Sequence, residues 1–93
     1  MISFTQCIAV PVDVLMREVA WESVILNLNT ETYYGLDEVG TQIWLALTNS
    51  ETIQHAYEQV LDAYDVDPET LHNDMTQLIE DLVHHGLLEI RSP

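Results

Sequence analysis

The fold is decided between residues 23 and 44, where the sequence reads SVILNLNTETYYGLDEVGTQIW. In residues 23–28 the side chains of Val24, Leu26 and Leu28 point one way and their neighbours point the other way, which is the period of a strand rich in branched residues. The next three residues interrupt the run, and Asn29 tolerates the left-handed backbone that a tight hairpin often needs. Residues 32–36 then have the pattern of a second strand.

A helix is predicted directly after this hairpin. Asp37 is a natural N-cap, because its carboxylate can accept a hydrogen bond from an amide one turn further on. From there Val39, Ile43 and Leu47 repeat at helical spacing, which predicts a helix over residues 37–47. The deciding stretch is therefore a strand, a turn, a strand and a capped helix.

Upstream of this stretch, residues 14–19 have the pattern of a further strand, joined to the next by the short link 20–22. Short connections favour antiparallel pairing, so we expect a three-stranded antiparallel sheet. The strand over residues 32–36 is the last of the three, and we expect one of its edges to be unpaired. Residues 1–12 are interpreted as an extended arm or an edge strand.

Two more helices are predicted downstream. The second ends near Tyr64, and its start has two candidate caps, a capping box from Thr48 to Glu51 or Ser50. The third begins at Asp67-Pro68-Glu69, which combines a cap, a proline at the first helical position and an acid in the first turn, and Gly86 ends it. Residues 87–90 form a short final strand or an apolar tail. The whole chain, residues 1–93, is predicted to be one α+β domain whose last two helices resemble a helix-turn-helix.

The charge of the chain excludes several classes of partner. Sixteen acidic residues stand against Arg17 and Arg91, for a formal net charge of −14. A nucleic-acid-binding protein needs Lys and Arg to neutralise phosphates, and an anionic membrane surface repels the same charge. We therefore expect no nucleic acid and no membrane among the partners, and a neutral or basic partner is favoured. Cys7 is the only cysteine, so no internal disulfide forms, and a cytoplasmic setting is expected.

The residues that carry chemistry in enzymes do not form a recognisable set here. A metal site needs a tight cluster of ligands, whereas His84 and His85 point about 100° apart on a helix and suit its negative end. No signature of a nucleophilic cysteine surrounds Cys7. The carboxylate pairs are typical of helix caps and solvated faces, and the three glycines form no phosphate loop. We expect a protein that is not an enzyme and that has no metal and no cofactor.

Two tyrosines in the last strand allow two interpretations. Tyr33 and Tyr34 are either ordinary strand aromatics or part of a binding site. In the second interpretation the free edge of their strand, with the third helix beside it, forms a groove for an extended peptide. Backbone hydrogen bonds at such an edge provide general affinity, and apolar pockets select alternate side chains.

Several segments of the chain resemble the PqqD-like family of peptide-recognition proteins. The resemblance lies first in residues 23–28 and in the run Tyr34-Gly-Leu-Asp-Glu-Val-Gly-Thr-Gln-Ile-Trp44. It continues in the third helix and its ending, through Tyr64-Asp65, Leu71, Asp74, Met75, residues 78–82 and Gly86-Leu-Leu88. Within the family the chain is most similar to the stand-alone B1 proteins of lasso-peptide biosynthesis. Residues 1–12 have no counterpart in the resemblance.

The resemblance implies a winged-helix-like recognition element that does no chemistry. Such an element binds the leader of a precursor of a ribosomally synthesised and post-translationally modified peptide (RiPP). The leader adds an antiparallel strand to Thr32–Leu36 and packs against the third helix, residues 68–85. The complex is then presented to a separate maturation enzyme, in lasso systems a cysteine protease. Relatives serve radical-enzyme pathways and pyrroloquinoline quinone synthesis, which stay open as alternatives.

On this hypothesis the backbone of Tyr33, Tyr34 and Gly35 pairs with the leader, apolar residues wall its pockets, and Asp74 or Asp81 attracts a basic leader residue. The candidate peptide-binding residues are Leu26, Thr32, Tyr33, Tyr34, Gly35, Leu36, Leu71, Asp74, Met75, Leu78, Asp81 and Leu82. The free protein is expected to be a monomer or a weak homodimer. The alternative from another class is a winged-helix transcription regulator, although acidic residues in its recognition helix would repel phosphate.

Overall fold

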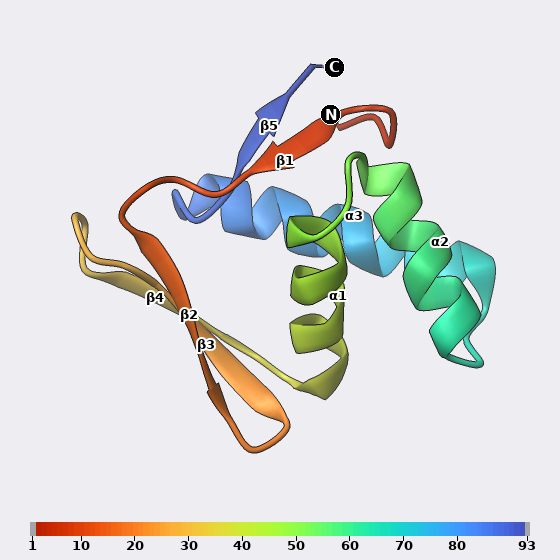
Figure 1. Ribbon diagram of the computed structural model, residues 1–93, viewed down its shortest axis with the longest axis horizontal. Coiled ribbons are helices and arrows are strands. Elements are labelled where there is room, and N and C mark those ends of the chain that lie inside the picture. The colour runs from red at the N-terminus through yellow and green to blue at the C-terminus, as the bar shows by residue number, and fades with distance from the viewer. Residues whose placement is uncertain (1, 93) are drawn as a thin grey trace.

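The computed structural model describes residues 2–92, so the two ends of the predicted domain, Met1 and Pro93, lie outside the described residues. Figure 1 shows a twisted sheet beside three helices. The elements in chain order are β1 (Cys7–Ala9), β2 (Val14–Val19), β3 (Glu22–Asn27), β4 (Thr32–Leu36), α1 (Glu38–Thr48), α2 (Ile53–Ala63), α3 (Pro68–His84) and β5 (Glu89–Arg91). The predicted α+β class, with three antiparallel strands followed by three helices, is confirmed.

The main sheet has the strand order β2-β3-β4, and both of its pairs are antiparallel. Ala20 and Trp21 form the two-residue turn between β2 and β3, and Ala20 takes the left-handed backbone, with φ of 59°. Along β3 the buried positions alternate with half-buried ones, so Ile25 enters the core and Leu26 lies on the outer face. This alternation is the one that the sequence predicts.

The turn between β3 and β4 differs from the prediction in one respect. The residue with the left-handed backbone is Glu31, with φ of 61°, so the expectation for Asn29 is wrong. The turn is held by the side chain of Asn27, whose Oδ1 accepts hydrogen bonds from the amides of Asn29 at 2.9 Å and Thr30 at 3.1 Å. Because these bonds curl the chain around Asn27, the left-handed residue falls at the end of the turn.

The predicted caps of α1 and α3 are confirmed. Asp37 Oδ1 accepts from the Gly40 amide at 2.7 Å, and Asp67 Oδ2 accepts from the Thr70 amide at 3.0 Å. At the end of α3, Gly86 has φ of 73°. There the Gly86 amide donates to the carbonyl of Val83 and the Leu87 amide donates to that of Leu82, a Schellman ending that turns the chain sharply.

The start of α2 corrects both candidate caps. The N-cap is Thr52, whose side chain accepts from the His55 amide at 3.1 Å. Thr48 instead donates back to the carbonyl of Trp44 within α1, and the buried hydroxyl of Ser50 has no hydrogen-bond partner. Thr48, Ser50 and Thr52, at every second position, each have the chemistry of a cap, and α2 begins after the last of them.

The short strand β1 pairs antiparallel with β5, which places Ile8 opposite Ile90. The first residues of the chain also bind the start of α2. The Gln54 amide donates to the carbonyl of Phe4, and the Ile53 amide donates to the carbonyl of Gln6. These pairings decide the two open alternatives, because the arm contains a strand and the chain ends in a strand. Figure 1 shows this pair above the helices, away from β4.

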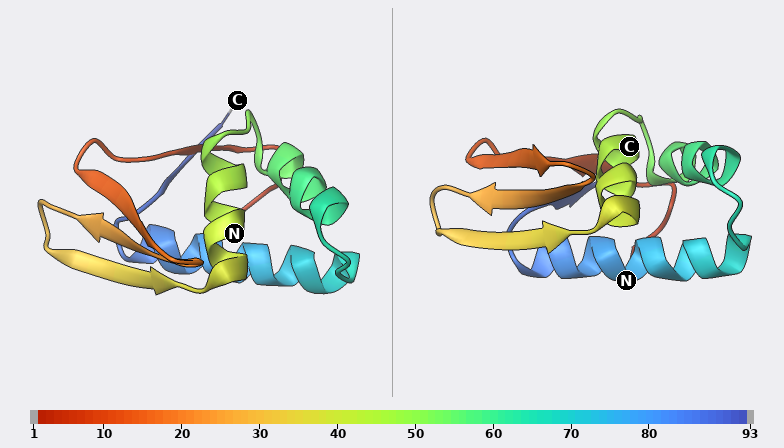
Figure 2. Two further views of the ribbon diagram at one scale, coloured as in Figure 1. Left: turned by 60° about the horizontal axis from the view of Figure 1, so that its bottom comes forward. Right: turned by 90° about the horizontal axis from the view of Figure 1, so that it is seen from below.

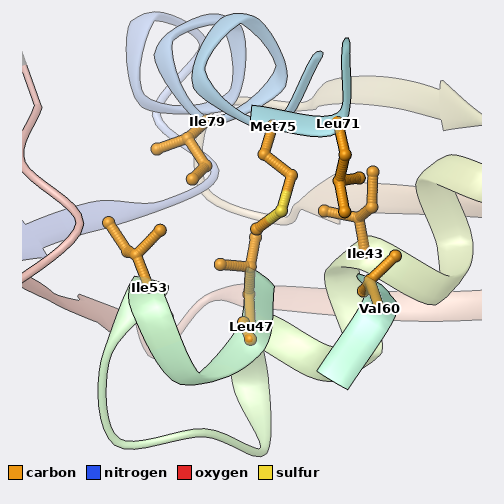
Figure 3. Packing of buried hydrophobic residues seen from close by; sticks show 8 residues of the cluster. Ile43, Leu47, Ile53, Val60, Leu71, Met75 and Ile79 are labelled. Atoms are coloured by element: carbon orange, nitrogen blue, oxygen red, sulfur yellow. The ribbon is translucent and has the colours of Figure 1, made fainter. Parts of the chain in front are cut away.

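The core has two adjoining parts. One lies among the three helices, where Leu47, Ile53, Met75 and Ile79 are fully buried or nearly so (Figure 3). The other lies between the inner face of the sheet, α1 and the end of α3, around Ile25, Leu82 and residues 87–88. Together they fix α3 beside the sheet, and in the right-hand view of Figure 2 β4 is the strand of the main sheet nearest to it. None of the helices in residues 2–92 combines the length and apolar character needed to cross a membrane.

Candidate functional site

The open edge of β4 is the first component of the site. β4 pairs with β3 on one side, and within residues 2–92 no strand pairs with its other side. The strand of the N-terminal arm, β1, pairs with β5 and does not cover this edge. The edge is therefore a row of backbone donors and acceptors available to a further strand.

The register shows which residues offer these groups. A two-residue hairpin closes on a hydrogen-bonded pair, here Val19 with Glu22, and bonded and non-bonded pairs alternate from there. Counted along β3, the residues that bond to β4 are 23, 25 and 27, and their partners on β4 are 36, 34 and 32. The amides and carbonyls of Tyr33 and Gly35 consequently face the open edge, whereas the backbone of Tyr34 is directed toward β3.

A groove of about 340 Å³ runs beside this edge. Its floor and walls come from β4, from the start of α1 and from the face of α3 that turns toward the sheet. The lining residues are Tyr34, Gly35, Leu36, Asp37, Gly40, Ile43, Asp74, Gln77, Leu78 and Asp81. Three of the ten lining residues, Leu36, Ile43 and Leu78, are aliphatic, three are aspartates, and none is cationic.

Tyr34 spans the groove at one end. Its hydroxyl donates a hydrogen bond to Asp81 Oδ2 at 3.3 Å, which links β4 to α3, and its ring meets the ring of His85 edge to face at 5.5 Å between centroids. Burial raises the pKa of Tyr34 above its ordinary value of 10.0, and the charge and hydrogen bond of Asp81 raise it further. Both effects disfavour the phenolate, so the neutral tyrosine is the form that holds the link.

We expect the Tyr34–Asp81 contact to be measurable by titration. Since the folded pKa of Tyr34 lies above its unfolded value, its contribution to stability is complete below about pH 10 and is lost as the pH rises through the folded pKa. Asp81→Asn should lower the pKa of Tyr34, read from tyrosinate absorbance as the difference between each protein and its Tyr34→Phe derivative. Glu69→Gln, at the far end of α3, is the control. A Tyr34 pKa that is unchanged in Asp81→Asn would contradict the coupling.

Six of the predicted site residues lie together in this groove. Tyr34, Gly35 and Leu36 come from β4, and Asp74, Leu78 and Asp81 come from α3. The helical residues stand three and four positions apart, so they share one face of α3, which is the face toward β4. The structure therefore brings the strand and the helix of the hypothesis to a common surface.

The other six predicted residues lie elsewhere. Leu71, Met75 and Leu82 are buried in the core behind the groove, with exposures of 4%, 0% and 0%, so they support α3 without reaching the surface. Leu26 and Tyr33 are register partners on the outer face of the sheet, where Tyr33 is 71% exposed. Thr32 begins β4, and its hydroxyl accepts from that of Thr30.

Four groove residues were missing from the prediction: Asp37, Gly40, Ile43 and Gln77. Gln77 could have been found, because it lies three residues after Asp74 and four before Asp81 on the same helical face. Asp37 follows β4 directly, but the sequence analysis assigned it as a helix cap, and it assigned Ile43 to the apolar repeat of the helix. Among residues 2–92, no three His, Cys, Asp or Glu side chains are grouped so as to hold a metal ion.

These features define a small α+β domain with three antiparallel strands, three helices and an open sheet edge beside the third helix. Residues 22–88 match the family model of coenzyme PQQ synthesis protein D (PqqD), and the chain belongs to that family. Its fold is similar to the solved structure of TbiB1 in complex with the TbiA(beta) leader peptide, with a TM-score of 0.78 and 31% sequence identity. The similarity covers 86% of this chain and 93% of that one. No curated protein sequence is significantly similar to this chain.

Proposed function

We propose that this protein binds the leader segment of a ribosomally made precursor peptide as an added antiparallel strand on β4. The observation that carries the proposal is the open β4 edge with a groove between it and α3. Two further facts support it: the chain belongs to the PqqD family, and the similar protein TbiB1 is described in complex with a leader peptide. The protein would act in the cytoplasm, where precursors are made.

An added strand would use both parts of the site. Its backbone would bond to Tyr33 and Gly35, which supplies affinity for any extended segment. Its side chains would alternate between the groove and the outer face of the sheet. Apolar anchors in the groove contribute about 1.5–3 kcal/mol each, from which the cost of ordering the peptide, about 2–5 kcal/mol, is subtracted. Two or three anchors alone leave less than about 7 kcal/mol, so the backbone hydrogen bonds of the added strand are needed to reach a micromolar dissociation constant.

The charge of the groove adds a preference. Asp37, Asp74 and Asp81 line it, and none of its lining side chains is cationic. A Lys or Arg in the leader would be attracted there, while an acidic leader residue would be repelled. The net charge of −14 acts in the same direction at longer range and favours a leader that is neutral or basic.

Cleavage of the precursor would be the work of a separate enzyme. The groove contains tyrosine, glycine, aspartate, glutamine and aliphatic side chains, and none of these residues forms a nucleophile with an adjacent base. Cys7 is in β1 and does not line the groove. We propose that the protein presents the bound leader to a maturation enzyme, with a lasso-type leader protease as the first candidate and a radical enzyme as the alternative.

The test is a proline substitution at the open edge. Gly35→Pro removes one edge-facing amide, and peptides selected from a random library on the wild-type protein should bind this variant about tenfold more weakly or worse. Binding is measured by calorimetry and folding by circular dichroism. Glu18→Pro is the matched control, because the same alternation places the Glu18 amide on the opposite, outer edge of β2. Unchanged affinity in a folded Gly35→Pro protein would refute strand addition at β4.

A further inference from the structure

Gly35 lies inside β4, next to its last residue, and no contact within the described chain requires a glycine there. Among residues 2–92 the glycine with positive φ is Gly86, so the backbone at Gly35 does not require glycine. A Cβ atom built at Gly35 would meet no other atom within 4 Å. Glycine weakens a strand, and a glycine inside a strand often marks a place where another molecule approaches closely. The open space at Gly35 therefore points to something outside the chain.

A second hollow lies at this position, on the other side of the strand. It has a volume of about 330 Å³ and is lined by Val19, Glu22, Ser23, Val24, Gly35, Leu36 and Asp37. Val24 is the register partner of Gly35, and both lie on the outer face of the sheet. Gly35 also lines the groove beside α3, so it separates two hollows on opposite faces of β4.

We propose that Gly35 keeps open a second side-chain pocket, which accepts one large apolar residue of the added strand. This inference rests on the proposed function. A guest residue opposite Gly35 has its side chain on the outer face, whereas the residues before and after it point into the groove. The guest side chain lies over Gly35 and toward Val24, which is the register partner of Gly35 on β3. Consecutive guest residues are therefore recognised on alternate faces of the sheet.

The composition of the outer hollow favours a large apolar side chain, with aromatic rings first. Val24 is half-buried, so a guest side chain that crosses Gly35 would cover apolar surface that now faces water. An aromatic residue placed across from a strand glycine packs over the vacant position. Glu22 and Asp37 at the rim disfavour an acidic side chain.

The experiment compares what three proteins select from the same random peptide library, of about a dozen residues so as to exceed the length of β4. The proteins are the wild type, Gly35→Ala and Gly35→Val. The wild type should select Phe, Tyr, Trp, Leu or Ile at one fixed position, and Gly35→Val should select Gly, Ala or Ser there. Wild-type peptides should bind Gly35→Val roughly 10- to 100-fold more weakly, as expected for one displaced apolar side chain, and Gly35→Ala should be intermediate.

The folded state of these variants is checked by their melting temperature. Since no atom lies within 4 Å of the added Cβ and valine favours strands, neither variant should melt below the wild type. If Gly35→Val fails to fold, Gly35→Ala is used instead. Peptides selected by Gly35→Ala should then have smaller residues at the fixed position than peptides selected by the wild type.

Two outcomes overturn the outer pocket alone: the same preference in wild type and variant, or a small residue at the fixed position in wild-type peptides. In both cases the proposed function stands, provided that Gly35→Pro still weakens binding. Absence of any captured peptide, or affinity that is unchanged in folded Gly35→Pro, refutes the proposed function itself. The two proposals therefore fail in different ways.

Discussion

Replacing Met75 by alanine is expected to lower the free energy of unfolding by about 2–5 kcal/mol, the range for truncating a fully buried Met in a core. Met75 is 0% exposed, and Figure 3 shows its side chain pointing from α3 toward Leu47 of α1. A domain of this size has a total stability of about 5–15 kcal/mol, so the loss is a large share. Chemical denaturation followed by circular dichroism measures it.

The matched variant for this prediction is Met75→Leu, which keeps the side-chain volume and should cost less than about 1.5 kcal/mol. Because Met75 lies behind the groove, either variant should bind peptide with unchanged affinity under conditions where it is folded. A direct loss of affinity in folded Met75→Leu would show that Met75 contacts the peptide after all.

Asn27→Ala should lower the free energy of unfolding by about 2–3 kcal/mol, because three hydrogen bonds of a buried side chain are lost together. Asn27 is 8% exposed. Its Oδ1 accepts from two amides of the β3–β4 turn, and its Nδ2 donates to the carbonyl of Gly86 at 3.0 Å, directly after α3. One side chain thus joins the hairpin that carries β4 to the end of the helix that faces it. Chemical denaturation should show the lower stability, and the affinity for peptide should fall as well.

Asn27→Asp separates the two connections. Aspartate keeps the acceptor for the turn but puts a carboxylate oxygen against the Gly86 carbonyl in place of the donor, so its effect is an upper limit for the link between the hairpin and α3. Asn29→Ala is the control, because the Asn29 side chain has no such role and its expected change is within about 0.5 kcal/mol. Equal stability of Asn27→Ala and Asn29→Ala would contradict the role given to Asn27.

The sequence predicts the sheet and the helix ends well because their signals are local. The alternation from Ser23 to Asn27, the cap at Asp37 and the Pro68 start of α3 each depend on residues only a few positions apart. The predicted N-cap of α2 was wrong because the choice of cap does not depend on local signals alone. Thr48, Ser50 and Thr52 are equivalent as local signals, and the choice between them depends on contacts with Phe4 and Gln6 at the other end of the chain.

The site was only partly predictable for a similar reason. Periodicity shows which residues of α3 share a face, but it does not show which face packs in the core and which turns toward β4. Met75, Ile79 and Leu82 face the core, while Asp74, Leu78 and Asp81 face the groove, and this difference is set by the packing of α3 against α1 and the sheet. The pairing of β1 with β5 joins residues about eighty positions apart, and no local pattern predicts such a contact.

The bond from Asn27 to Gly86 also has a kinetic consequence. This hydrogen bond connects the hairpin to the end of α3 and helps to hold β4 and α3 at a fixed separation before a peptide binds. The binding site is therefore preorganised, and the protein loses little conformational entropy on binding. The ordering penalty then falls almost entirely on the flexible guest. Differences in residence time among leaders should follow their individual side chains, while their association rates stay within a narrow range.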